Sequence, residues 1–137
     1  MLKPFVGVVP LAPLLTVVFS DDFETSLGRV TNPNGTDTAT TGMWERGNPE
    51  ATDSGGAKQL GTTTSADFLR VSVIGTTTSV LFQRVGSATN LNGAWAAASA
   101  NLTPFAGQTI RLLIEAADAG TASLVEAGID DVRITRQ

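Results

Sequence analysis

Apolar and polar residues alternate one by one in the second half of the chain, which is the period of a half-buried β-strand. The run 68–74 places Leu69, Val71 and Val73 on one face and polar residues on the other. A second run, 79–85, follows after a Gly-Thr-Thr-Thr turn. Two such runs joined by a short Gly-containing turn predict a β-hairpin.

Further strands are predicted toward the C-terminus. The run 109–117 has aliphatic residues or alanine at even positions, and Arg111 and Glu115 face the other way. The last strand is expected at 128–135. The segment "AWAAASANL", residues 94–102, is also expected to be a strand, because Asn and Gly precede it and Pro104 follows.

Short strands at a spacing of roughly ten residues predict an all-β fold, specifically an antiparallel jelly-roll-like β-sandwich. A chain of 137 residues lies within the range of one domain. We assign residues 20–137 to a single β-sandwich domain. Within it, residues 31–65 are rich in Thr, Gly, Asn and Asp and are predicted to be loops with one short strand around 43–46.

Residues 1–19 form a separate N-terminal segment. One cation, Lys3, precedes an apolar stretch that Pro4, Pro10 and Pro13 interrupt. Two interpretations fit this pattern: a secretory signal, or an extended linker or gene fragment that starts at an internal methionine. A stable membrane span is not expected, because the prolines break the apolar run. We expect a secreted, extracellular protein.

Charge and composition exclude several classes of function. The net charge is −4 and the few Lys and Arg residues are scattered, so no basic stripe is available for nucleic acid. The chain has no His, Cys or Tyr. Disulfides, thiolate chemistry, His-ligated zinc and nucleophile–histidine relays are therefore excluded, and we expect no enzymatic activity.

Two acidic clusters lie near the two ends of the predicted domain. Asp130 has the parity of Val132 and therefore points toward the apolar side of an ideal strand, whereas Asp131 points outward. A buried carboxylate needs a compensating partner, and the other cluster, "SDDFE", follows the apolar N-terminal run. We predict that Asp22, Glu24, Asp130 and Asp131 bind a structural calcium ion if the first and last strands pair. The alternative is two solvated acidic turns.

Trp44 and Trp95 are the only tryptophans of the chain. Exposed aromatic rings can stack on sugars, so the pair is a candidate ligand surface. The alternative is that both rings lie in the hydrophobic core.

Three stretches carry a family resemblance: "SDDFET", "GTDTATTGMWERGNPEATDSGGAKQLGTTTS" and "WAAASANLTPFAGQTIRLLIEAADAGTASLVEAGIDDVRITRQ". They resemble the C-terminal accessory domain of secreted actinobacterial zinc carboxypeptidases of the M14 type. They are more loosely similar to immune-inhibitor-A-like and MAM modules. The resemblance spans residues 20–137 and implies a non-catalytic, secreted β-sandwich. It also implies that the opening "DFE" and the closing "IDDV" lie close together around a structural calcium ion.

The sequence departs from the family pattern at one point. The accessory domains have a long stretch with several core strands after the "GTTTS" segment, whereas here Ser65 runs directly into Ala66. An incomplete sandwich would expose strand edges, and we expect a homodimer through exposed strands. The expected function is to stabilise or tether a peptidase domain or an extracellular polymer. Two alternatives stay open: a carbohydrate-binding module, and a truncated remnant without function.

Overall fold

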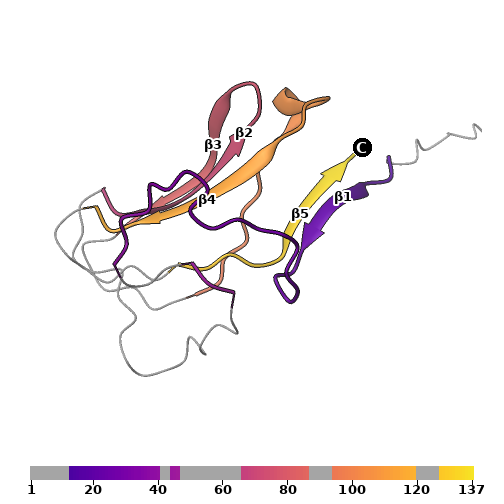
Figure 1. Cartoon of the computed structure of the whole chain (residues 1–137). Helices are drawn as coiled ribbons and strands as arrows, with labels where there is room; N and C mark the ends of the chain where they lie inside the picture. The colour runs from indigo at the N-terminus through magenta and orange to yellow at the C-terminus, as the bar shows by residue number, and fades with distance from the viewer. Residues whose placement is uncertain (1–12, 41–43, 47–65, 87–93, 120–126) are drawn as a thin grey trace, which may run out of the picture. The chain divides into compact units, whose positions relative to one another are not determined.

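A computed structural model describes residues 13–40, 44–46, 66–86, 94–119 and 127–137 of the chain (Figure 1). Its elements, in chain order, are β1 (Thr16–Asp21), β2 (Phe68–Ile74), β3 (Thr78–Val85), the 3-10 turn η1 (Thr103–Phe105), β4 (Arg111–Ala117) and β5 (Val132–Arg136). All strand pairs among them are antiparallel. The predicted all-β, antiparallel class is therefore confirmed.

The contacts divide the chain into two compact units. The first comprises Met1–Gly47 with Ile129–Gln137, and the second comprises Asn48–Gly128. The first unit contains a two-stranded ribbon of β1 and β5, and the second contains a three-stranded sheet in the order β3-β2-β4.

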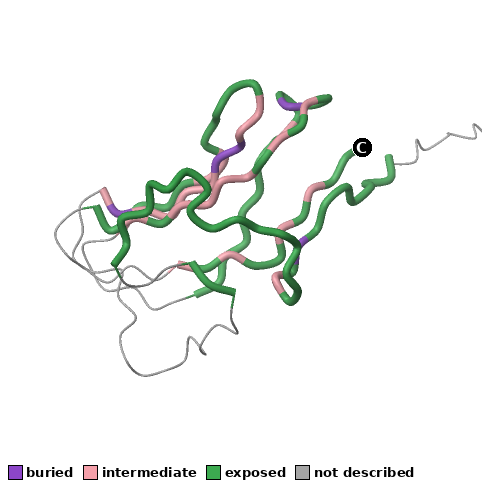
Figure 2. The backbone as a smooth tube through the Cα atoms, in the orientation of Figure 1, coloured by how far each residue is buried: buried purple, intermediate pink, exposed green. Residues whose placement is uncertain are grey.

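Strands β2 and β4 share an apolar face of the three-stranded sheet. Val71 lies opposite Ile114 of β4, and Val73 lies opposite Leu112. Val73 is fully buried, and Figure 2 shows a buried stretch along β2. The alternation in 68–74 and 109–117 thus predicts both strands and the face that they share. A register shift after Val71 interrupts the pairing of β2 with β3.

On the opposite face of this sheet, polar side chains surround Arg70. Arg70 lies opposite Glu115 on β4 and Gln83 on β3. Its Nε donates a hydrogen bond to Gln83 Oε1 at 3.0 Å, and its guanidinium lies 4.0 Å from the centre of the Phe68 ring. The long side chain of Arg70 therefore covers apolar surface while its charge stays near water.

Asp67 ties the start of β2 to the ends of its two neighbours. Its Oδ1 accepts a hydrogen bond from Ala119 N at 2.8 Å, and its backbone carbonyl accepts one from Gly86 N at 2.8 Å. The residue is fully buried, which is tolerated because these groups are hydrogen-bonded.

The strand expected at 94–102 is absent, and that prediction is wrong: these residues are described and form no regular element. The reason is the turn that follows. The 3-10 turn η1 begins at Thr103 and contains Pro104. Asn101 Oδ1 accepts a hydrogen bond from Thr103 N at 2.9 Å, and Phe105 N donates to Leu102 O at 2.9 Å. Local side-chain and turn hydrogen bonds thus replace a strand ladder at this point.

The first and last strands, β1 and β5, pair with each other, which is the condition on which the calcium prediction depends. In the β1–β5 ribbon Asp21 lies opposite Val132 and Phe19 opposite Ile134. However, β5 begins at Val132, and not at residue 128 as predicted. Residues 44–46 are outside any strand, so the short strand expected there is also wrong over these residues. Met43 and Ser65 lie outside the described part of the chain.

None of the described residues forms a helix that is long and apolar enough to cross a membrane.

Candidate functional site

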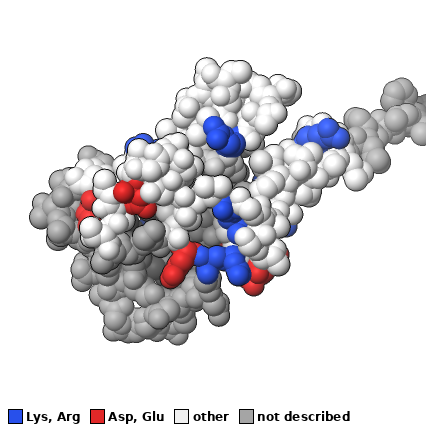
Figure 3. Space-filling model, viewed as in Figure 1, with Lys and Arg blue, Asp and Glu red and all other residues white. Residues whose placement is uncertain are grey.

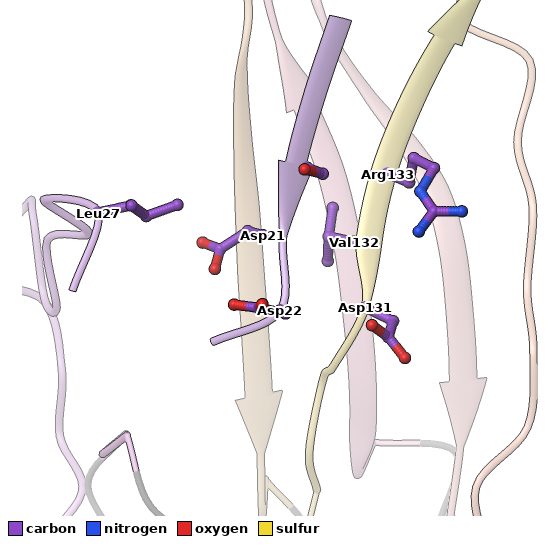
Figure 4. A pocket seen from close by; sticks show the side chains of 7 residues that line it. Asp21, Asp22, Leu27, Asp131, Val132 and Arg133 are labelled. Carbon is purple, nitrogen blue, oxygen red and sulfur yellow. The ribbon is translucent and has the colours of Figure 1, made fainter. Parts of the chain in front are cut away.

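A hollow of about 380 Å³ lies where β1 ends and β5 begins (Figure 4). It is formed entirely within the first unit and contains both a strand end and the loop that follows it. The residues that line it are Ser20, Asp21, Asp22, Leu27, Asp131, Val132 and Arg133.

Asp21 is the most buried acid of this hollow and forms an ion pair with Arg29. Arg29 Nε donates to Asp21 Oδ2 at 2.7 Å and Nη2 donates to Oδ1 at 2.5 Å, which is the two-pronged geometry that makes such pairs strong. Phe23 N adds a third hydrogen bond to Oδ1 at 2.9 Å. Only 5% of the Asp21 surface is exposed.

The arginine is itself fixed by two further contacts. Its Nη2 donates to Thr25 O at 3.0 Å, and its guanidinium lies 4.3 Å from the centre of the Phe23 ring. Phe23 adopts a left-handed conformation with φ of 58°, which is uncommon for a residue of this size. The turn after β1 is thus organised around the Asp21–Arg29 pair.

The ion pair shifts the pKa values of both partners. The hydrogen bond from Arg29 holds the pKa of the Asp21 carboxyl below its ordinary value; burial acts in the opposite direction, and the Phe23 N–H lowers the pKa further. The hydrogen bond to Asp21 likewise raises the pKa of Arg29. Asp21 is therefore a structural anion whose charge is already compensated.

Asp22 and Glu24, two of the predicted calcium ligands, lie in the turn after β1. Asp22 Oδ1 accepts a hydrogen bond from Glu24 N at 3.1 Å. The Glu24 carbonyl accepts one from Arg46 Nη1 at 2.9 Å, so residue 46 supports this turn. Asp22 lines the hollow, whereas Glu24 does not.

The other two predicted ligands, Asp130 and Asp131, precede β5. Both are exposed, so the expectation that Asp130 points to the apolar side of a strand is wrong. The reason is the backbone of Asp131, which has φ of 50° and cannot continue an extended strand. Asp131 N also donates to Asp130 Oδ1 at 2.8 Å, a local contact typical of turns.

The structure brings two of the four predicted ligands to the same hollow, namely Asp22 and Asp131. Figure 4 shows their carboxylates pointing to opposite sides of the ribbon. Within the described ranges, no three acidic side chains come together in a group that could hold a metal ion. The calcium ion stays a prediction.

Sequence reasoning missed Asp21 and Arg29 as the central pair of this site. Asp21 belongs to the quoted "SDDFE" cluster, but it has the same charge as its neighbours. A signal was present in its position: Asp21 is the last residue of β1, and Arg29 is the first cation after it.

Trp44 and Trp95 are both exposed, with 36% and 56% of their surface accessible. The alternative that places them in the core is therefore wrong. Trp95 lies over Gly128, where a Cβ atom would come within 3.1 Å of the ring atom Cη2. The two rings belong to different units.

On the face drawn in Figure 3, Lys and Arg side chains lie at several separate places, as expected from their scattered positions in the sequence.

No family model matches the sequence, and no curated protein and no solved structure matches it either.

Proposed function

We propose that the chain is a non-catalytic accessory β-module of a secreted protein and that it stabilises or tethers a zinc carboxypeptidase domain. One observation carries the proposal. The strand that runs into "DFE" pairs with the strand that follows "IDD", with Asp21 opposite Val132. This is the juxtaposition that the resemblance to carboxypeptidase accessory domains implies.

The ends of the β1–β5 ribbon favour a module attached to a larger protein. Thr16 and Arg136 are register partners, so the chain enters β1 and leaves β5 at the same end of the ribbon. Adjacent entry and exit points are common in domains generally, and they allow a domain to be joined to another one. The Asp21–Arg29 pair lies at the opposite end and holds the turn there.

The residue inventory supports a non-catalytic role. Without His, Cys or Tyr anywhere in the 137 residues, acid–base and nucleophilic catalysis would depend on Asp, Glu, Lys, Ser and Thr alone. Asp21, the most buried acid of the hollow, is already committed to Arg29.

The test uses the full chain and the catalytic domain of a secreted zinc carboxypeptidase prepared without its own accessory module. We expect an equimolar amount of the chain to raise the thermal midpoint of the peptidase domain, because a partner that binds only the folded state stabilises it. An unrelated β-protein of similar size serves as the control. A midpoint that does not respond, together with no co-elution of the two proteins, would refute the proposal.

Trp95 supports a second candidate function, carbohydrate binding. Its ring is held against Gly128 and remains 56% exposed, so it presents a flat apolar surface of the kind that stacks on sugars. Affinity electrophoresis in soluble polysaccharides tests this candidate. Retardation that Trp95→Ala removes and Trp44→Ala leaves intact would favour carbohydrate binding over the peptidase-accessory function. Equal migration with and without polysaccharide would exclude carbohydrate binding for those polymers.

A further inference from the structure

We infer that β1 is a docking edge for a second copy of this chain, and that two β1 strands pair antiparallel around Val18. The inference is independent of the proposed function. One edge of β1 pairs with β5. The inference rests on the other edge, called here the outer edge of β1 and formed by residues Thr16–Ser20. Among the described residues, no strand pairs with this outer edge.

This edge is apolar and exposed on both faces. Val17, Val18 and Phe19 keep 51%, 50% and 43% of their surface accessible, and Figure 2 shows the strand as exposed along nearly its whole length. It contains no proline and no charged residue between Thr16 and Ser20. Natural proteins usually protect free strand edges with such residues, because an unprotected edge is a template for pairing with another chain.

The other strand of the ribbon is protected. β5 has two exposed cations, Arg133 and Arg136, within five residues. Pairing two copies through β5 would bring these cations near one another, whereas pairing through β1 would not. The nearest acid on β1 is Asp21, whose charge is compensated by Arg29. The charge distribution therefore selects the edge of β1.

The sequence of this edge is complementary to itself, and this points to a second copy as the occupant. In an antiparallel pair centred on Val18, Val18 faces its counterpart, Val17 faces Phe19, and Thr16 faces Ser20. Aromatic–β-branched pairs and hydroxyl pairs are among the favourable cross-strand combinations. Val18 also has no Cα partner on β5, because the ladder shifts register between Val17 and Phe19. The pairing is isologous and closes as a twofold dimer, with the strand order β5-β1-β1-β5.

The chain has no cysteine, so single cysteine substitutions report the register directly. Directly opposite residues of an antiparallel pair have Cα atoms about 4.5–5.5 Å apart, which is within the range that a disulfide spans. Val18→Cys should therefore form a covalent dimer of the full chain when it is oxidised with diamide. Thr16→Cys should not, because the two copies of residue 16 would be displaced by four residues, or about 13 Å along the strands.

A mixture of Thr16→Cys and Ser20→Cys should form a cross-linked heterodimer, although neither variant forms a homodimer. Val80→Cys is the matched control, since Val80 is also an exposed valine of an edge strand, with 55% of its surface accessible. Light scattering of the unmodified chain should show a mass that rises from monomer to dimer with concentration. A strictly monomeric chain would overturn the inference. So would cross-linking of Thr16→Cys or Val80→Cys as fast as Val18→Cys.

Discussion

Replacing Gly75 by alanine tests how the turn between β2 and β3 is held in place. A Cβ atom at this position would lie 2.6 Å from Gln108 Oε1, 3.3 Å from Phe105 Cδ1 and 3.4 Å from Ile110 Cγ2. The first distance is too short for any stable contact, so the side chain of Gln108 must move. The backbone of Gly75 is not in the left-handed region, and alanine therefore adds no conformational strain there.

The displaced side chain is the one that connects this turn to the segment before β4. Gln108 Oε1 accepts hydrogen bonds from Thr76 N at 2.9 Å and from Thr76 Oγ1 at 3.0 Å. Each bond contributes about 0.5–1.5 kcal/mol to stability. Alanine also lowers the entropy of the unfolded chain, which offsets about 0.4–1 kcal/mol. We expect a net loss of about 1–2 kcal/mol.

A double-mutant cycle measured by urea unfolding isolates this mechanism. Gly75→Ala, Gln108→Ala and the combined variant are compared with the unmodified chain. Because the clash exists only when both side chains are present, Gly75→Ala should cost much less in the Gln108→Ala background, with a coupling energy of about 0.5–3 kcal/mol as found for residues in contact. Strictly additive losses would refute the contact between residues 75 and 108.

Three further predictions concern the core, the ion pair and the calcium ion. Val73→Ala should lower the free energy of unfolding by about 1.5–3 kcal/mol, because the side chain is fully buried. Val80→Ala, at a position with 55% exposure, should change it by less than about 0.5 kcal/mol. Equal losses for the two variants in denaturant unfolding would contradict the observed burial. The pKa of Asp21 is lowered on folding, so its pairing with Arg29 stabilises the chain above the unfolded pKa of about 3.9, and this contribution is lost as the pH falls through the folded pKa. The thermal midpoint of the unmodified chain should thus fall more than that of Asp21→Asn on acidification, and parallel curves would argue against the pair. The calcium prediction requires a higher unfolding midpoint in calcium than in EDTA. A calcium concentration of 100 times the dissociation constant should stabilise the folded chain by about 2.7 kcal/mol. Identical midpoints in calcium and in EDTA would reject the prediction.

The strands of the three-stranded sheet could be predicted from the sequence because their signal is local. Alternation in 68–74 reflects which side chains face the apolar side, and the observed register places Val71 beside Ile114 and Val73 beside Leu112. The segment 94–102 has no comparable signal. Its alanines favour a helix over a strand and give no alternation. The turn that follows is set by Pro104 and by the hydrogen bond to Asn101.

The start of β5 could not be predicted because a single backbone conformation sets it. Residues 128–135 alternate well enough for a strand, yet Asp131 adopts φ of 50° and the strand begins one residue later. Asp tolerates this left-handed conformation better than most residues do. Hydrophobic alternation indicates which face a residue prefers, but it contains no information on such a change of direction.

The acidic cluster after β1 shows why residue type alone could not define the site. Asp21 and Asp22 are adjacent and chemically identical, but Asp21 is buried against Arg29 while Asp22 is exposed and hydrogen-bonds only locally among the contacts described. Asp21→Asn would therefore disturb the turn itself, and any loss of ligand binding in that variant would be ambiguous. Asp22→Asn leaves the ion pair in place. It is the variant in which a lost calcium response would indicate a lost ligand, and a retained response would show that Asp22 does not bind the ion.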